Sequence, residues 1–205
     1  MRRGGSATGR GSVRCVAAVA GFVLAGGHSS RMGRDKALLD VGGEPLAARI
    51  ARLMVQAAGS AVIIGDPQRY GILGFPVLPD RIAGLGPMGG LLTALETTTA
   101  PWNLLVACDM PGITAALLEE IAGRAQRAPD QCCIAAVSSR GPEPLCAAYH
   151  RACLPAVQRA VSAGRLRMSE LLSRLNPVGV PVNDAHVLEN VNTPAEWFAW
   201  QGPQG

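Results

Sequence analysis

The chain has 205 residues, a formal net charge of +4 and 48% hydrophobic residues, and a chain of this size forms one sizeable core, most simply a single α/β domain. Its cations are scattered outside two short clusters and do not alternate with aromatic residues, so a nucleic-acid partner is disfavoured and a small anionic substrate is favoured. The six cysteines include no C-x-x-C pair, and there are only three histidines, so we expect no zinc site and buried, reduced thiols.

Residues 1–12 are polar, rich in glycine and without periodicity, so we expect a disordered N-terminal tail followed by one domain over residues 13–205. Residues 13–25, with Arg2 and Arg3 before them, imitate a secretory signal. Cleavage near Ala25 would remove the first strand of the domain, however, and the segment is too short to span a bilayer. We therefore expect a cytoplasmic protein with no membrane partner.

The apolar run at residues 16–24 predicts a buried strand, and residues 24–36, which read LAGGHSSRMGRDK, predict a phosphate-binding loop at its end. Gly26 and Gly27 let main-chain N–H groups approach phosphate oxygens, and Arg31, Arg34 and Lys36 supply positive charge. The spacing matches neither the P-loop nor the dinucleotide-binding fingerprint. The alternative is an ordinary surface loop with solvated charges, which the density of glycine and cations at a strand end disfavours.

Strands and helices alternate through the rest of the chain. We predict strands at residues 61–64, 75–78, 103–107, 132–138, 144–149 and 178–182. We predict helices from Pro45, from Pro87, over residues 113–121, over residues 152–163, over residues 168–175 and from Pro194, and a turn at residues 140–142. This order implies a single Rossmann-like three-layer α/β domain, with a mainly parallel sheet and helices on both faces.

Two aspartates follow predicted strands, at the edge where such sheets bind ligands. Asp80 comes after residues 75–78, and Asp109 comes after residues 103–107. A carboxylate at Asp109 facing the phosphate loop is suited to Mg²⁺, which takes oxygen ligands from one or two carboxylates and from substrate phosphates. The alternatives are a helix N-cap at Asp109 and a turn residue at Asp80. The GPMGG run at residues 86–90 either starts a helix or also permits close approach by a ligand.

The C-terminal half contains candidate contacts for a second substrate. Arg165 is placed to meet a substrate phosphate, with a solvated charge at a helix end as the alternative. Asn190 and Asn192 flank one residue in the sequence NVNTP, so in an extended segment both amides face the same side. We expect that side to face the second substrate or the metal, and we expect Thr193 to cap the last helix.

These segments together resemble a known family. LAGGHSSRMGRDK, DRIAGLGPMGG, ACDMP, EPLCAAY and NVNTPAE, in this order and spacing, are similar to the molybdenum cofactor guanylyltransferases. The resemblance covers residues 21–201, and LAGG is informative because related cytidylyl- and uridylyltransferases usually carry LAAG there. It implies transfer of GMP from GTP to the phosphate of molybdenum-bearing molybdopterin with release of pyrophosphate, Mg²⁺ as the cofactor, and molybdenum enzymes or their insertion chaperones as further partners.

The resemblance also implies roles for individual residues. The backbone of Leu24, Ala25 and Gly26 would hold the nucleotide, Lys36 would contact phosphate, Asp80 would help to select guanine, and Asp109 would bind both nucleotide and Mg²⁺. Residues 13–110 would form the nucleotide half and residues 111–205 the acceptor half. Family members often carry an asparagine after the second strand, where this chain has Gly65 and Asp66; Asp66 is the candidate substitute.

The chemistry that the residues suggest agrees with this resemblance. An attacking phosphate is already anionic, so the reaction needs charge neutralisation, here by Arg31 and Lys36, rather than a strong base. We expect Cys108 to pack in the core rather than act as a nucleophile. Two alternatives remain: a nucleotidyltransferase with another base or acceptor (cytidylyl transfer, or a sugar-phosphate or phosphoenolpyruvate-type acceptor), and a non-catalytic GTP-binding protein that delivers the cofactor.

Overall fold

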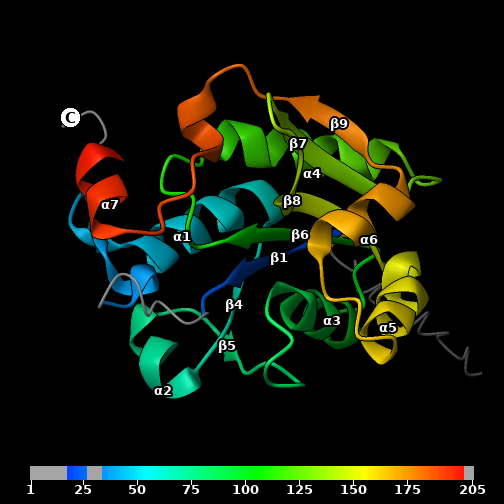
Figure 1. The fold of residues 1–205 in the computed structure, drawn as a ribbon, viewed down its shortest axis with the longest axis horizontal. Coiled ribbons are helices and arrows are strands. Elements are labelled where there is room, and N and C mark those ends of the chain that lie inside the picture. The colour runs from blue at the N-terminus through cyan, green and yellow to red at the C-terminus, as the bar shows by residue number, and fades with distance from the viewer. Residues whose placement is uncertain (1–17, 27–33, 201–205) are drawn as a thin grey trace, which may run out of the picture.

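A seven-stranded sheet forms the centre of the molecule in the computed structural model, which describes residues 18–26 and 34–200. Figure 1 shows the sheet between two layers of helices. The strand order is β5-β4-β1-β6-β8-β7-β9. The strands are β1 (Val19–Leu24), β4 (Val62–Ile64), β5 (Val77–Leu78), β6 (Trp102–Ala107), β7 (Cys133–Ser138), β8 (Gly141–His150) and β9 (Val178–Pro181).

Seven α-helices accompany the sheet in the described part of the chain: α1 (Leu46–Ala58), α2 (Pro67–Tyr70), α3 (Pro87–Thr97), α4 (Ala115–Arg127), α5 (Leu154–Ser162), α6 (Met168–Leu175) and α7 (Pro194–Trp200). Short 3₁₀ turns lie at η1 (Lys36–Leu38), η2 (Gly71–Leu73), η3 (Arg151–Cys153) and η4 (Ala185–Leu188), and β2 (Asp40–Val41) pairs with β3 (Glu44–Pro45) in a small hairpin. None of these helices is long and apolar enough to cross a membrane, as far as residues 18–26 and 34–200 are concerned.

The predicted mainly parallel α/β sheet is confirmed. β1 pairs in parallel with β4 and β6, β4 with β5, and β7 with β9, whereas β8 runs antiparallel to both β6 and β7. The reversal follows from the short β7–β8 connection, because antiparallel strands need only a tight turn. The turn predicted at residues 140–142 was placed slightly too late, since Gly141 already pairs with Ser138.

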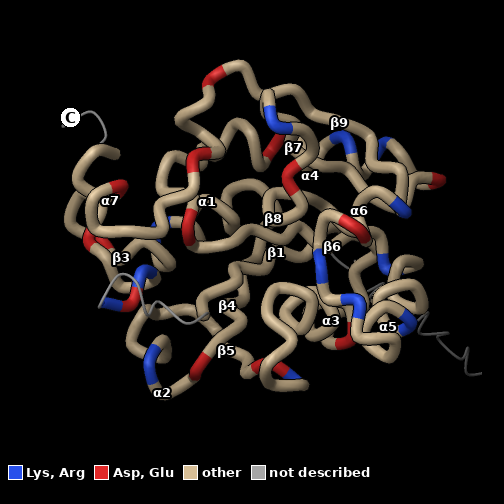
Figure 2. The backbone as a smooth tube through the Cα atoms, in the orientation of Figure 1, with Lys and Arg blue, Asp and Glu red and all other residues tan. Residues whose placement is uncertain are grey.

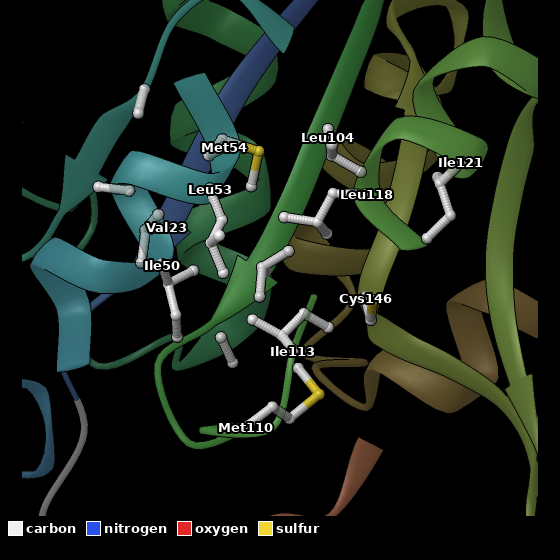
Figure 3. Close-up of a cluster of buried hydrophobic side chains, with 14 of the residues drawn as sticks. Val23, Ile50, Leu53, Met54, Leu104, Met110, Ile113, Leu118, Ile121 and Cys146 are labelled. Carbon is white, nitrogen blue, oxygen red and sulfur yellow. The ribbon is translucent and has the colours of Figure 1, made fainter. Parts of the chain in front are cut away.

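Each face of the sheet has its own hydrophobic cluster. On one face, α1 and α4 pack against β1 and β6; Figure 3 shows Ile50, Leu53 and Met54 of α1 beside Leu118 of α4. On the other face, α3, α5 and α6 cover the alternate side chains of the same strands, such as Phe22. Because neighbouring residues of a strand point to opposite faces, these buried strands carry nearly continuous apolar sequence.

The described cysteines behave as the sequence predicts. Cys108, Cys133, Cys146 and Cys153 are buried free thiols, and Cys132 is partly buried. Thr193 also has its predicted role, because its hydroxyl accepts from Glu196 N at 3.2 Å at the start of α7 while Glu196 accepts from Thr193 N at 3.0 Å. This reciprocal pair is a capping box. The predicted tail at residues 1–12 lies outside the described residues.

Candidate active site

The carboxyl ends of β1, β4, β5 and β6 meet at one edge of the sheet and border a cavity of about 250 Å³. Parallel strands end at the same edge, so residues far apart in the sequence come together there. Figure 1 shows α3 beside this region. The cavity is lined by Leu24, Ala25, Gly26, Asp35, Lys36, Ile64, Asp80, Gly86, Pro87, Gly90, Ala107, Cys108, Asp109 and Leu145.

The backbone that follows β1 forms one wall. Ala25 N donates to Ile64 O at 2.9 Å and Cys108 N donates to Leu24 O at 3.0 Å, so strand pairing continues to the last residue before the turn. Gly26 then has a φ of 149°, a conformation that residues with a Cβ rarely adopt. In α3, a Cβ on Gly90 would lie 2.5 Å from the Leu24 side chain. The absence of a side chain at Gly90 therefore allows α3 to pack closely against Leu24 at the end of β1.

Lys36 is the first residue of η1, and its side chain is hydrogen-bonded. Its ammonium donates to Asn192 Oδ1 at 2.5 Å, across 156 positions of sequence. Asp35 caps η1 by accepting from Ala37 N at 3.1 Å, and its other oxygen accepts from the Tyr70 hydroxyl at 2.8 Å. Neither Asp35 nor Tyr70 was predicted as a site residue; the one sequence signal was the position of Asp35 next to Lys36.

Asp109 is mostly buried, and its Oδ1 has no hydrogen-bond partner among the described residues. Burial raises the pKa of this carboxyl, while the nearby Lys36 ammonium lowers it and Glu143 raises it further. The N-cap alternative is wrong, because Thr114 caps α4 by accepting from Leu117 N at 3.3 Å. A buried, unpartnered carboxylate oxygen is unfavourable by itself and is suited to a bound cation.

The segment that precedes α7 is fastened to the end of β6. Val191 N donates to Asp109 O at 2.8 Å, and the next residue, Asn192, contacts Lys36. The structure thus brings Asn192, Lys36 and Asp109 together. Asn190 is half-buried but does not border the cavity.

Asp80 borders the cavity from the end of β5. Partial burial raises the pKa of its carboxyl. No ion pair or hydrogen bond of this side chain occurs within residues 18–26 and 34–200, so it has none of the local bonds typical of a turn aspartate. Its oxygens are free to accept from a ligand.

Two other predicted contacts, Arg165 and Asp66, do not border this cavity. Arg165 borders a second cavity of about 240 Å³ between α5 and α6, with Arg159 and Arg174, and this cavity shares no lining residue with the first. Figure 2 shows several cationic positions around these helices. Asp66, the candidate substitute for the family asparagine, instead caps α2 by accepting from Gln68 N at 2.9 Å. Arg31 and Gly27 lie outside the described residues.

Cys108 has the packing role that the sequence predicts. It is only 7% exposed, and burial raises the pKa of its thiol to about 12. At neutral pH the group is therefore a thiol, whereas a nucleophile would need to be a thiolate.

Comparison with known proteins agrees with this geometry. Residues 21–178 match the family model of the MobA-like NTP transferase domain. The chain is 36% identical over 189 residues to the probable molybdenum cofactor guanylyltransferase of Synechococcus elongatus. The aligned region covers 89% of this chain and 97% of that protein. It is also 36% identical over 186 residues to the molybdenum cofactor guanylyltransferase of Rhodobacter capsulatus, covering 87% and 92%.

A solved structure shows the same fold. The molybdopterin-guanine dinucleotide biosynthesis protein A of Archaeoglobus fulgidus superposes with a TM-score of 0.72 at 23% sequence identity, over 89% of this chain and 96% of that one. The arrangement of strands and helices described above is therefore the fold of that protein.

Proposed function

The chain belongs to the MobA-like NTP transferase family and, within it, to the molybdenum cofactor guanylyltransferases, and on this premise we propose that it transfers GMP from GTP to the phosphate of molybdopterin that carries molybdenum. One observation carries the proposal: Lys36, Asp80 and Asp109 border a single cavity at the carboxyl ends of the strands. A cation for phosphate, a free carboxylate for a base and a buried carboxylate for a metal ion are the groups that this reaction needs.

The reaction exchanges one phosphorus–oxygen bond for another. An oxygen of the molybdopterin phosphate bonds to the α-phosphorus of GTP, the bond from that phosphorus to the α,β-bridging oxygen breaks, and its electron pair leaves with pyrophosphate. A phosphate monoester loses its second proton at a pKa of about 6, so it is already a nucleophile at neutral pH. The main barrier is the approach of two anions, which positioning and charge neutralisation lower.

Lys36 is the residue that we assign to the triphosphate. Its ammonium contacts the neutral amide of Asn192, and no acidic side chain of the described residues lies within ion-pair distance of it. The adjacent Asp35 directs its oxygens to Ala37 N and to Tyr70 instead. The positive charge of Lys36 therefore remains available to phosphate oxygens, and it neutralises charge that moves toward pyrophosphate during transfer.

Asp109 is suited to hold Mg²⁺. Its unpartnered buried oxygen supports this assignment, and within residues 18–26 and 34–200 there is no cluster of three acidic, histidine or cysteine side chains that offers a competing site. Mg²⁺ commonly takes one carboxylate with the rest of its ligands from phosphate and water. When bound, the ion would supply further neutralisation of the triphosphate oxygens.

We assign base selection to Asp80, and its place at the border of the cavity supports this assignment. A carboxylate accepts two hydrogen bonds from guanine, one from N1–H and one from the exocyclic amine. Adenine has no donor at these two positions, so its binding would leave the Asp80 carboxylate partly desolvated and unpaired. Such a mismatch discriminates strongly between ligands.

Measurement of pyrophosphate release tests the proposal against its alternatives. The purified chain is incubated with molybdenum-bearing molybdopterin and each of the four nucleoside triphosphates, with and without Mg²⁺. We expect release with GTP in the presence of both acceptor and Mg²⁺. Faster release with CTP, or release with a sugar phosphate in place of molybdopterin, would support a transferase of another base or acceptor. GTP binding without any turnover would support the delivery protein.

A further inference from the structure

Tyr70 lies between two segments that border the cavity, the backbone that follows β1 and the start of η1. It is the last residue of α2, it is only 2% exposed, and it does not line the cavity itself. Its hydroxyl donates to Asp35, which directly precedes Lys36. We propose that Tyr70 is a positioning residue for nucleotidyl transfer, one that fixes Lys36 through Asp35. This inference rests on the guanylyl transfer proposed above.

The Tyr70 ring packs beside Gly65, next to the backbone that follows β1. A Cβ on Gly65 would lie 2.1 Å from Ala25 O and 2.6 Å from Cε2 of the Tyr70 ring. Gly65 itself stays in the sheet, because its N–H donates to Leu78 O at 2.9 Å. The ring therefore fills the space that a side chain at position 65 would need, directly beside the backbone wall after β1. This packing fixes the point from which the hydroxyl acts.

The Tyr70 hydroxyl contacts Asp35, which caps η1 directly before Lys36. Among the residues that the structure describes, Asp35 has three partners: Ala37 N at 3.1 Å, the Tyr70 hydroxyl at 2.8 Å and Arg69 Nη1 at 3.6 Å. The Arg69 side chain is 65% exposed and also faces Asp66, so it contributes little. The bond from Ala37 N to Asp35 joins residues two positions apart, so it does not connect Asp35 to another element. Within residues 18–26 and 34–200, Tyr70 is thus the one buried partner that connects Asp35 to another part of the fold.

The Tyr70 hydroxyl keeps its proton and therefore donates to Asp35 at neutral pH. Burial raises the pKa of Tyr70, and the hydrogen bond to Asp35 raises it further, so the hydroxyl is protonated at neutral pH and donates to Asp35. Loss of this bond removes the buried link between Asp35 and α2, so that Asp35 keeps its local bond to Ala37 N and the exposed Arg69, while Lys36 keeps its contact with Asn192. Because a misplacement of about 1 Å at a reacting centre costs up to about 100-fold in rate, a looser Lys36 should slow the transfer step more than it weakens GTP binding.

The chain supplies a matched control for this test. Tyr149, the second of its two tyrosines, is fully buried in β8 and donates its hydroxyl to Pro144 O, also at 2.8 Å. Neither residue lines the cavity. Tyr70→Phe and Tyr149→Phe each remove one buried hydroxyl and keep the ring. If the two variants differ in kcat, the cause is therefore the specific bond from Tyr70 to Asp35, because both variants lose one buried hydrogen bond.

We expect Tyr70→Phe to lower kcat for GMP transfer about tenfold with a smaller change in KM for GTP, and Tyr149→Phe to leave kcat within about twofold. In the Lys36→Ala background, Tyr70→Phe should have little further effect, because it acts through Lys36. An unchanged kcat in Tyr70→Phe, an equal loss in both tyrosine variants, or full additivity with Lys36→Ala would each overturn the inference.

A second readout does not depend on turnover. Lys36 is the single lysine of the chain, so acylation by an amine-reactive ester, followed by mass spectrometry, reports its accessibility directly. We expect acylation of Lys36 to be about threefold or more faster in Tyr70→Phe, because local opening becomes easier, and unchanged in Tyr149→Phe. Equal rates in all three proteins would refute the positioning role. Absence of transfer in the wild type would instead refute the proposed function, and the acylation rates would still decide the role of Tyr70.

Discussion

Replacing Asp109 by asparagine should make the protein more stable and far less active. In the metal-free protein, the Asp109 carboxylate is mostly buried and its Oδ1 lacks a partner. A buried polar atom without a hydrogen bond costs about 1–3 kcal/mol, and more when charged. The nearby Lys36 offsets part of this penalty. We therefore expect Asp109→Asn to raise the free energy of unfolding by on the order of 1 kcal/mol near pH 7.

The pH dependence of this gain has a defined sign. Burial raises the folded-state pKa of Asp109 above its ordinary value of 3.8, so the ionised group destabilises the fold at pH values above the folded pKa. The penalty decreases as the pH falls through that pKa and disappears below the unfolded value, where both states are protonated. The stability difference between Asp109→Asn and wild type should therefore be greatest at neutral pH and absent in acid.

Activity should change in the opposite direction. Asparagine keeps the shape of the side chain but removes the anionic ligand, so we expect the rate at limiting Mg²⁺ to fall about 100- to 1,000-fold, or about 3–4 kcal/mol in the barrier. Urea denaturation of the metal-free proteins and pyrophosphate release measure the two effects. Asp130→Asn is the control, since Asp130 is exposed and has no ion pair within the described residues. A destabilised Asp109→Asn variant, or one with wild-type rates at limiting Mg²⁺, would refute this reasoning.

Three further predictions follow from the same cavity. Lys36→Ala should lower kcat by about two to three orders of magnitude with an unchanged thermal midpoint, because the ammonium neutralises charge in the transition state; normal kinetics would make Lys36 an ordinary surface charge. Asp80→Ala should reduce the use of GTP far more than that of ATP in parallel kcat/KM measurements, and an equal loss with both would exclude base recognition. Chelation of divalent ions should abolish pyrophosphate release and added Mg²⁺ should restore it, whereas undiminished release in excess chelator would argue against a metal requirement.

Most of the fold could be predicted because its strong local signals agree with its tertiary packing. Buried parallel strands such as β6 are nearly continuous apolar runs, and α1 and α3 begin at or next to prolines. The elements that were missed are the β2–β3 hairpin, with two residues in each strand, and the single turn of α2. Segments this short show no periodicity, so only the tertiary structure reveals them.

The site was predictable where a residue type and a strand end coincide, as at Asp109 and Lys36. The partners that hold these residues were not. Tyr70 has the sequence character of any core aromatic residue, and its bond to Asp35 spans 35 positions. Asn192 was predicted to lie near the site, but its contact with Lys36 depends on how the chain returns to the end of β6. Such long-range pairs follow from topology and not from local pattern.

The contacts of Val191 with Asp109 and of Asn192 with Lys36 affect the order in which the protein folds. Lys36 acquires its amide partner from a segment 156 positions further along the chain, so its contacts are complete only after residue 192 has been synthesised. Contacts of such large sequence separation carry a high loop-closure cost and form late in folding. A nascent or prematurely terminated chain ending before residue 191 would retain the strands of the central sheet but lack both of these contacts, so its Lys36 would have no amide partner.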